Sequence, residues 1–325
     1  MGADHAHTIR TAVPAATVVA VADVDGERAV TLSQQLGARV FVNDDDLIAS
    51  PDVDAVIIAS HDSAHAHQVL ACINAGKPVL CEKPLAPTVE DCHRIVVAQQ
   101  ERDQGDLVSV GFMRRFHAGF AAMKAELASG ELGAPLLVVG SHRNVHAYPT
   151  GGSEGTLTNS AVHDIDIIEW LLGHPIVEVG WYAPKPTSLD TSRHDPQLIQ
   201  LRNADGVLAS IDLFVNAQYG YDVHYEVVCE RGAVRLTPTA PIVTDRDLTH
   251  AYQHSADWRP FFAEAYRLEL QAWTDAVSNG RPTPLATAEN GLRSTLVAQA
   301  LVQSMRMRQA VMVNDVWSDL VNSGV

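Results

Sequence analysis

The chain has 325 residues, more than one ordinary hydrophobic core holds, so we expect two domains. Apolar residues make up 46% and charged residues 19%, which excludes a disordered chain and is typical of a globular protein. The net charge of −16 excludes a nucleic-acid footprint, because phosphate binding requires clustered lysine and arginine.

The first part of the chain alternates apolar runs with amphipathic segments. After a helix at 3–13, we expect strands at 17–23, 39–42, 53–60, 77–84 and 107–112, separated by helices at 26–37, 44–50, 64–76 and 88–103. The β-branched runs "TVVAVAD" and "VDAVIIAS" are typical of strands buried on both faces. This alternation predicts an α/β domain with a Rossmann-like, doubly wound parallel sheet.

The pattern changes after residue 112. Helices at 116–128 and 158–172 are accompanied by strand-like runs at 135–144, 176–184, 197–202, 207–217, 222–230 and 233–237, and helices at 260–278 and 286–308 finish the chain. Successive strands with tight turns favour a large, mostly antiparallel sheet. We therefore predict a nucleotide-binding domain at 1–112 and a second α/β domain, for substrate binding and oligomerisation, at 113–325.

A parallel sheet of this type usually opens with a strand and a G-x-G-x-x-G turn that holds a pyrophosphate. Here the chain enters a helix at once, and Gly2 resembles the last glycine of that fingerprint. We interpret this as a shortened N-terminus; the alternative is a domain that never had the turn. Without that strand the sheet exposes edges and loses half of the pyrophosphate cradle, which puts NAD binding by this chain in question.

Asp23 ends the first visible strand of the predicted parallel sheet. An acid there accepts hydrogen bonds from the ribose hydroxyls of a dinucleotide and repels a 2′-phosphate, which favours NAD over NADP. The alternative is a structural acid at a helix start, because Asp25 stands nearby and either residue is a suitable N-cap.

Lys83 lies in "CEKP", at the carboxyl end of a predicted parallel strand, where ligands bind in open α/β sheets. Pro84 restricts the backbone of the residue before it and so presents Lys83 in a defined direction. A lysine there hydrogen-bonds a substrate hydroxyl and influences proton transfer. A solvated lysine at a strand end is the alternative.

The stretch "TNSAVHDIDIIEWLLG" places Asn159 and His163 four residues apart, and hence on one face of a helix. His163 is a candidate general base, because the ordinary pKa of histidine suits neutral pH. Asp164 and Asp166 orient neighbours or face solvent. A structural role is the alternative for His163.

Neither metal nor disulfide chemistry has support in the sequence. The histidines at 5 and 7, and at 61, 65 and 67, lack zinc-site spacing, so we expect no metal. The four cysteines form no C-x-x-C pair, and we expect buried, reduced thiols. With no apolar run of membrane-spanning length and no signal peptide visible, we expect a cytoplasmic protein.

Five motifs in order resemble the glucose-fructose oxidoreductase/inositol dehydrogenase (Gfo/Idh/MocA) family over nearly the whole chain. "AGKPVLCEKPLA" matches the most specific motif of that family. The other four look closest to its bacterial myo-inositol 2-dehydrogenase branch: "VGFMRRF", "SHRN", "NSAVHDIDIIEWLLG" and "DLFVNAQYGYDVHYEVV".

The resemblance implies an NAD-dependent dehydrogenase that oxidises a ring secondary alcohol, such as myo-inositol, to a ketone. It implies that His163 takes the hydroxyl proton, with Lys83 and Asn159 beside it in the catalytic site. The implied polyol contacts are Arg114, His142, Asn144 and Tyr221. The implied cofactor contacts are Gly2, Asp23, Ser60, His61, Glu82 and Lys83. It also implies a homo-oligomer, either dimer or tetramer, formed through the open face of the second sheet.

One residue departs from the family pattern. Asn159 stands where inositol dehydrogenases usually have an aspartate, and an amide cannot raise the basicity of the histidine as a carboxylate does. Two further hypotheses therefore stay open: a dehydrogenase or dehydratase-like relative acting on another sugar, and a catalytically silent sugar-binding or regulatory protein on the same scaffold.

Overall fold

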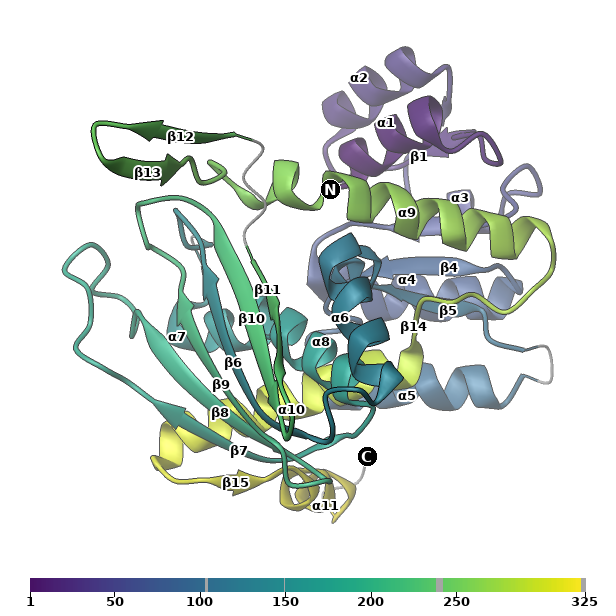
Figure 1. Ribbon diagram of the computed structural model, residues 1–325. Coiled ribbons are helices and arrows are strands. Elements are labelled where there is room, and N and C mark those ends of the chain that lie inside the picture. The colour runs from purple at the N-terminus through teal and green to yellow at the C-terminus, as the bar shows by residue number, and fades with distance from the viewer. Residues whose placement is uncertain (103–104, 149, 238–241, 323–325) are drawn as a thin grey trace. The chain divides into compact units, whose positions relative to one another are not determined.

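A computed structural model describes residues 1–102, 105–148, 150–237 and 242–322 (Figure 1). The chain forms two compact units. The first comprises Met1–Met113 with Glu264–Thr295, and the second comprises Arg114–Ala263 with Leu296–Val325. Helices α9 (Trp258–Ser278) and α10 (Ala288–Met307) each contribute residues to both units. None of the described helices combines the length and apolar content that crossing a membrane requires.

The first unit has the predicted alternation of strands and helices. Its strands are β1 (Ala20–Val21), β2 (Arg39–Val40), β3 (Val56–Ile58), β4 (Val79–Glu82), β5 (Val108–Gly111) and β14 (Ala286–Thr287). Its helices are α1 (Gly2–Ala12), α2 (Gly26–Leu36), α3 (Asp44–Ala49), α4 (Asp62–Ala75) and α5 (Val89–Gln100). Residue 103, the expected last residue of α5, lies outside the described residues. Gly37 and Gly76 adopt left-handed backbone after α2 and α4, so the helices predicted at 26–37 and 64–76 end at these glycines, as expected.

The strands of the first unit fall into two sheets. Parallel strands β3, β4 and β5 form one sheet with β14, which pairs antiparallel to β5, while β1 and β2 form a separate parallel pair. The prediction that 17–23 is a fully buried strand is wrong. Only Ala20–Val21 is a strand, both residues are half-buried, and Val19 is 44% exposed. Within the described residues, β1 pairs only with β2. The apolar run at 17–23 is therefore not buried on both faces.

The second unit is built on a seven-stranded sheet in the described chain, with the order β11-β10-β6-β9-β8-β7-β15. Its strands are β6 (Pro135–Arg143), β7 (Ile176–Tyr182), β8 (Gln197–Asn203), β9 (Leu208–Phe214), β10 (Asp222–Cys229), β11 (Ala233–Leu236) and β15 (Val311–Met312). Only β6 and β9 pair in parallel, so the predicted, mostly antiparallel sheet is confirmed. The helices are α6 (Ala118–Ser129), α7 (Gly152–Gly155), α8 (Val162–Leu172) and α11 (Val313–Asn322).

Several short elements had not been predicted. They are β14, β15, α11 and an exposed hairpin of β12 (Val243–Arg246) with β13 (Thr249–Tyr252). The predicted helix at 158–172 is also interrupted. Thr156–Ser160 (η2) is π-helical, and α8 begins only at Val162. A π-helical turn contains one residue more than an α-helical turn. A prediction from regular α-helical spacing therefore does not anticipate it.

The two faces of the large sheet differ. Tyr225 on β10 packs its ring edge-on against Phe120 of α6, at 5.4 Å between centroids, and lies on the buried face. The opposite face carries exposed apolar side chains at Leu137, Val139 and Leu208, where Leu137 and Leu208 are register partners on β6 and β9. Among the described residues, helices therefore cover one face, and these three apolar side chains are exposed on the other.

Candidate active site

The loops after β3 and β4 lie at the carboxyl edge of a parallel sheet, where open α/β folds bind ligands. Lys83 directly follows β4, is half-buried, and precedes Pro84 through a cis peptide bond. Glu82 is buried at the last position of β4, and its Oε1 lies 2.7 Å from Nε2 of His5 on α1. The first helix is thereby anchored beside the "EKP" motif.

The charge of Glu82 is stabilised by its neighbours. Burial alone would raise the pKa of this carboxyl, but the hydrogen bond and charge of His5, together with Lys83, lower it. The predicted cofactor residue Glu82 is thus an ionised carboxylate held by His5. The histidine had been considered only as a metal ligand, and its 77-residue separation from Glu82 left no local signal for the contact.

His65, on α4, connects the two loops. Its Nδ1 lies 2.7 Å from the carbonyl oxygen of Pro84, and its Nε2 lies 3.3 Å from the carbonyl oxygen of Ser60. The two predicted loop residues beside it have local partners as well. The Ser60 hydroxyl donates to Gln68 at 2.7 Å, and the His61 side chain caps α4 by accepting from the backbone N–H of Ser63.

Asp23 is not a helix cap. The N-cap of α2 is Asp25, which accepts from the backbone N–H groups of Glu27 and Arg28, so the capping alternative for Asp23 is wrong. Oδ1 of Asp23 instead accepts from the backbone N–H of Asp25 and from Arg28 Nη2, both at 2.9 Å. The Asp23 side chain is 37% exposed, so a ligand can reach it.

Gly2, the remaining predicted cofactor residue, is the first residue of α1. A Cβ placed there would meet the Cβ of Ala59 at 3.7 Å, which is ordinary contact. The amino end of α1 therefore lies beside the residue that follows β3. Amino ends of helices favour anions, so α1, Asp23 and the two loops suit a dinucleotide's pyrophosphate and ribose.

In the second unit, a buried polar network surrounds Asp164. Its Oδ1 accepts from Arg114 Nη1 at 2.6 Å and from the Tyr225 hydroxyl, and its Oδ2 lies 2.7 Å from Nδ1 of His142. Arg114 Nη2 also approaches His142, at 3.2 Å from Nδ1. Asp164 is 0% and Arg114 1% exposed, so the idea that Asp164 faces solvent is wrong.

A second carboxylate on α8 gives a contrast. Asp166 accepts two hydrogen bonds from Arg115, at 3.0 and 2.6 Å. Burial raises the pKa of Asp166 despite this arginine, with Glu169 nearby adding to the rise. Burial acts on Asp164 too, but Arg114, His142 and Tyr225 together push the pKa of Asp164 well below its ordinary value. Asp164 is therefore the firmly ionised member of the pair.

The structure brings three of the four predicted polyol residues together. Tyr221 is buried, with its ring edge-on to His142 at 6.4 Å between centroids, and burial raises its pKa. Arg114 contacts the same histidine. Asn144 follows β6, two residues beyond His142, and its backbone bonds to Phe214 and Ala217.

The predicted catalytic residues of this unit occupy different elements. His163 is 9% exposed in the first turn of α8, whereas Asn159 lies in the π-helical segment η2. The prediction that both belong to one regular helix is wrong for that reason. Asp164 and Tyr225 had not been predicted as site residues. The alternation of "DVHYEVVC" does place Tyr225 among buried valines, and a buried tyrosine hydroxyl needs a partner.

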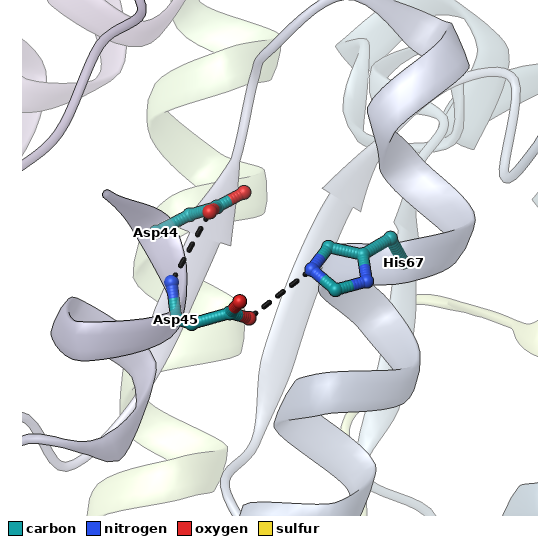
Figure 2. A group of neighbouring side chains, drawn as sticks. All are labelled: Asp44, Asp45 and His67. Carbon is teal, nitrogen blue, oxygen red and sulfur yellow. Dashed lines mark hydrogen bonds and ion pairs between the residues drawn. The ribbon is translucent and has the colours of Figure 1, made fainter.

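Within the described residues, one group of three side chains has its ligand-type atoms mutually close: Asp44, Asp45 and His67. Figure 2 shows Nε2 of His67 turned toward the carboxylate of Asp45, 3.1 Å away. Asp44 also accepts from Gln68 at 2.7 Å. Asp45 and His67 are exposed, and these contacts account for the cluster as a surface ion pair. The four cysteines are buried free thiols, as predicted.

Comparison with known proteins shows the same two parts. Residues 1–112 match the model "Oxidoreductase family, NAD-binding Rossmann fold", and residues 124–313 match "Oxidoreductase family, C-terminal alpha/beta domain". Inositol 2-dehydrogenase 2 of Paenarthrobacter aurescens is 45% identical over 94% of this chain and 93% of its own length. Inositol 2-dehydrogenase 2 of Saccharopolyspora erythraea is 43% identical over 94% of this chain and 90% of its own.

A solved structure is similar throughout. The myo-inositol dehydrogenase from Lactobacillus casei, in complex with NAD(H) and myo-inositol, superimposes with a TM-score of 0.93 at 32% identity. The match covers 96% of this chain and 93% of that one. Fold class and NAD as the cofactor are thereby confirmed. The chain belongs to the Gfo/Idh/MocA family of NAD-binding oxidoreductases.

Proposed function

We propose that this chain oxidises a ring hydroxyl of an inositol, myo-inositol first, to the ketone with NAD. The observation that carries the proposal is the buried cluster of Arg114, His142 and Tyr221, which supplies several hydrogen-bonding groups within one unit. A polyol needs such a group for each hydroxyl, because an unmatched buried polar group costs about 1–3 kcal/mol. The similarity to inositol 2-dehydrogenases over 94% of the chain supports the same substrate class.

In the first unit, Asp23 binds the adenosine ribose and the amino end of α1 at Gly2 faces the pyrophosphate. The loop residues Ser60 and His61 contact the nucleotide. Glu82, held ionised by His5, keeps a negative charge beside Lys83. Bound NAD supplies the hydride acceptor. Residues 1–112 are thus proposed as the cofactor domain, and residues 113–325 as the substrate and oligomerisation domain.

In the second unit, His163 accepts the hydroxyl proton as general base. In the first unit, Lys83 is the other proposed catalytic residue, and it hydrogen-bonds a substrate hydroxyl. Asn159, His142, Asn144 and Tyr221 bind the other hydroxyls. Arg114 is proposed to belong to this set as well. Its Nη1 donates to Asp164 at 2.6 Å, so contact with the polyol falls to its Nη2.

The test is turnover of a polyol panel by the purified chain, followed by NADH absorbance. We expect oxidation of myo-inositol, and a loss of at least about 100-fold in kcat for Lys83→Ala and for His163→Gln with NAD still bound. Lys77→Met is the matched control: this lysine binds the carbonyl of Ser50 at 2.5 Å, and its variant should keep normal kcat. Normal turnover by Lys83→Ala would contradict the proposal.

Asn159 motivates two other candidate functions. An amide in place of the usual carboxylate favours a different sugar as substrate, and activity on another sugar with none on inositols would select that function. Polyol binding with no turnover in the presence of bound NAD would instead select a silent binding protein.

We also infer a homo-oligomer, a dimer or tetramer, located in the cytoplasm. Assembly is supported by the exposed side chains of Leu137, Val139 and Leu208 on one face of the large sheet. Exposed apolar patches of this kind often mark protein–protein interfaces. Support for the location is the set of four reduced cysteines. Val139→Arg should shift sedimentation toward the monomer, whereas Val243→Arg on the separate β12–β13 hairpin should not. Unchanged sedimentation of Val139→Arg would contradict assembly through this face.

A further inference from the structure

The Asp164 carboxylate joins four segments that are distant in the chain. Its partners Arg114, His142 and Tyr225 lie 50, 22 and 61 residues away, on η1 (Met113–Phe116), β6 and β10. Asp164 is itself in the first turn of α8, next to His163. The carboxylate thus connects the turn that carries the proposed base to a histidine of the proposed polyol site.

The network also determines which nitrogen of His142 carries a proton. Asp164 is ionised and fully buried, so its oxygens only accept hydrogen bonds. Because Oδ2 lies 2.7 Å from Nδ1 of His142, that nitrogen must be the donor. A neutral ring of this tautomer has its lone pair on Nε2.

We propose that Asp164 is a positioning residue: it holds His142 in the Nδ1–H tautomer, so that Nε2 accepts a hydrogen bond from a polyol hydroxyl. The inference rests on the proposed function and extends it to a residue that touches neither substrate nor cofactor. Arg114 Nη2 lies 3.4 Å from Nε2, a long contact that a hydroxyl donor would outcompete.

Asp164→Asn tests the tautomer directly. Its amide oxygen still accepts from Arg114 and Tyr225, but its NH₂ group then faces Nδ1 of His142. Two donors cannot share that contact, so the histidine changes tautomer and Nε2 becomes a donor. We expect kcat/KM for the polyol to fall about 100-fold while the Kd for NAD stays within about threefold of wild type.

Asp166→Asn is the matched control. It is the same change, two residues further on the same helix, at a carboxylate that is also buried and bound by an arginine. A merely structural role of Asp164 predicts that both variants lower Tm and activity alike. The proposal predicts that both lower Tm, and that Asp166→Asn keeps kcat/KM within about threefold.

A double-mutant cycle isolates the path through His142. In a His142→Ala background, Asp164→Asn should change kcat/KM by less than about threefold, because the group that it orients is gone. An undiminished 100-fold loss in that background, or equal losses for the two asparagine variants, would overturn the inference.

If Asp164→Asn does not fold, His142→Asn replaces it. An asparagine amide there still donates to Asp164 but has no atom at the Nε2 position. The proposal then predicts a near-normal Tm with the same 100-fold loss in kcat/KM, and retained activity overturns it.

A wild-type chain inactive on every polyol would overturn the proposed function and the inference together. This result is recognised before any variant is made.

Discussion

His65 donates a hydrogen bond from Nδ1 to the carbonyl oxygen of Pro84, 2.7 Å away, while its Nε2 lies 3.3 Å from the carbonyl oxygen of Ser60. A neutral imidazole has one N–H, and the shorter contact is the one it supports. His65 is 2% exposed, so these contacts are protected from water. One buried histidine on α4, the helix that follows the loop after β3, therefore holds the loop that carries Lys83 by its hydrogen bond to Pro84.

His65→Phe should weaken NAD binding about tenfold, because it keeps the ring volume but removes about 1.4 kcal/mol of hydrogen bonding between α4 and the loop that carries Lys83. Calorimetric titration of NAD measures the change. His67→Phe, on the same helix with a 63% exposed side chain, is the control and should bind normally. Equal affinities for His65→Phe and wild type would show that this loop holds its position without the histidine.

The His5–Glu82 pair should make stability depend on acid pH. The folded pKa of Glu82 lies below its ordinary value of 4.5, so the pair stabilises the fold above about pH 4.5 and loses this effect as the pH falls further. His5→Phe keeps a ring against Tyr266 but removes the hydrogen bond. It should cost about 1–3 kcal/mol at neutral pH and less in acid.

Urea unfolding at neutral pH and at about pH 4 measures the two free energies of unfolding. His7→Phe serves as the control, since the backbone of His7 bonds to Thr11 and the structure gives its ring no part in the Glu82 contact. A cost for His5→Phe that is the same at both pH values would rule out the linkage.

Asp23→Ser should admit NADP. The substitution removes the carboxylate that repels a 2′-phosphate and leaves Arg28, now 2.9 Å from Asp23, beside the site. We expect the ratio of the NADP Kd to the NAD Kd to fall at least about tenfold, measured by calorimetry. Asp23→Ser with Arg28→Gln should lose the gain in NADP affinity. An unchanged ratio in the single variant would remove Asp23 from the ribose site.

Asn159→Asp should restore a carboxylate one turn before His163. A negative charge favours the protonated imidazole and raises its pKa, so the acid limb of the kcat profile should shift to higher pH. We expect kcat on the preferred polyol to rise about tenfold at a pH above that limb. Asn159→Ala provides the comparison. If the aspartate and alanine variants have the same pH profile, residue 159 does not act on the histidine electrostatically.

The local parts of this protein could be predicted from its residues. The ends of α2 and α4 follow from Gly37 and Gly76, because few other residues adopt left-handed backbone at low cost. A continuous β-branched run predicts β3, and strand-like runs joined by tight turns predict β8, β9 and β10. The "EKP" and "NSAVHD" motifs locate Lys83 and His163. Each of these signals depends on residues close together in the chain.

Only the tertiary structure decided which polar groups meet. His5 finds Glu82 77 residues away, and Asp164 collects three partners from other elements, because burial forces each charge to find a counterpart wherever the fold provides one. The exposure of Val19 before β1 and the π turn at Asn159 likewise depend on neighbours that a local pattern does not specify. Local residue patterns therefore specify the family and most of the longer elements, while the partners that set charge and proton positions come from the fold.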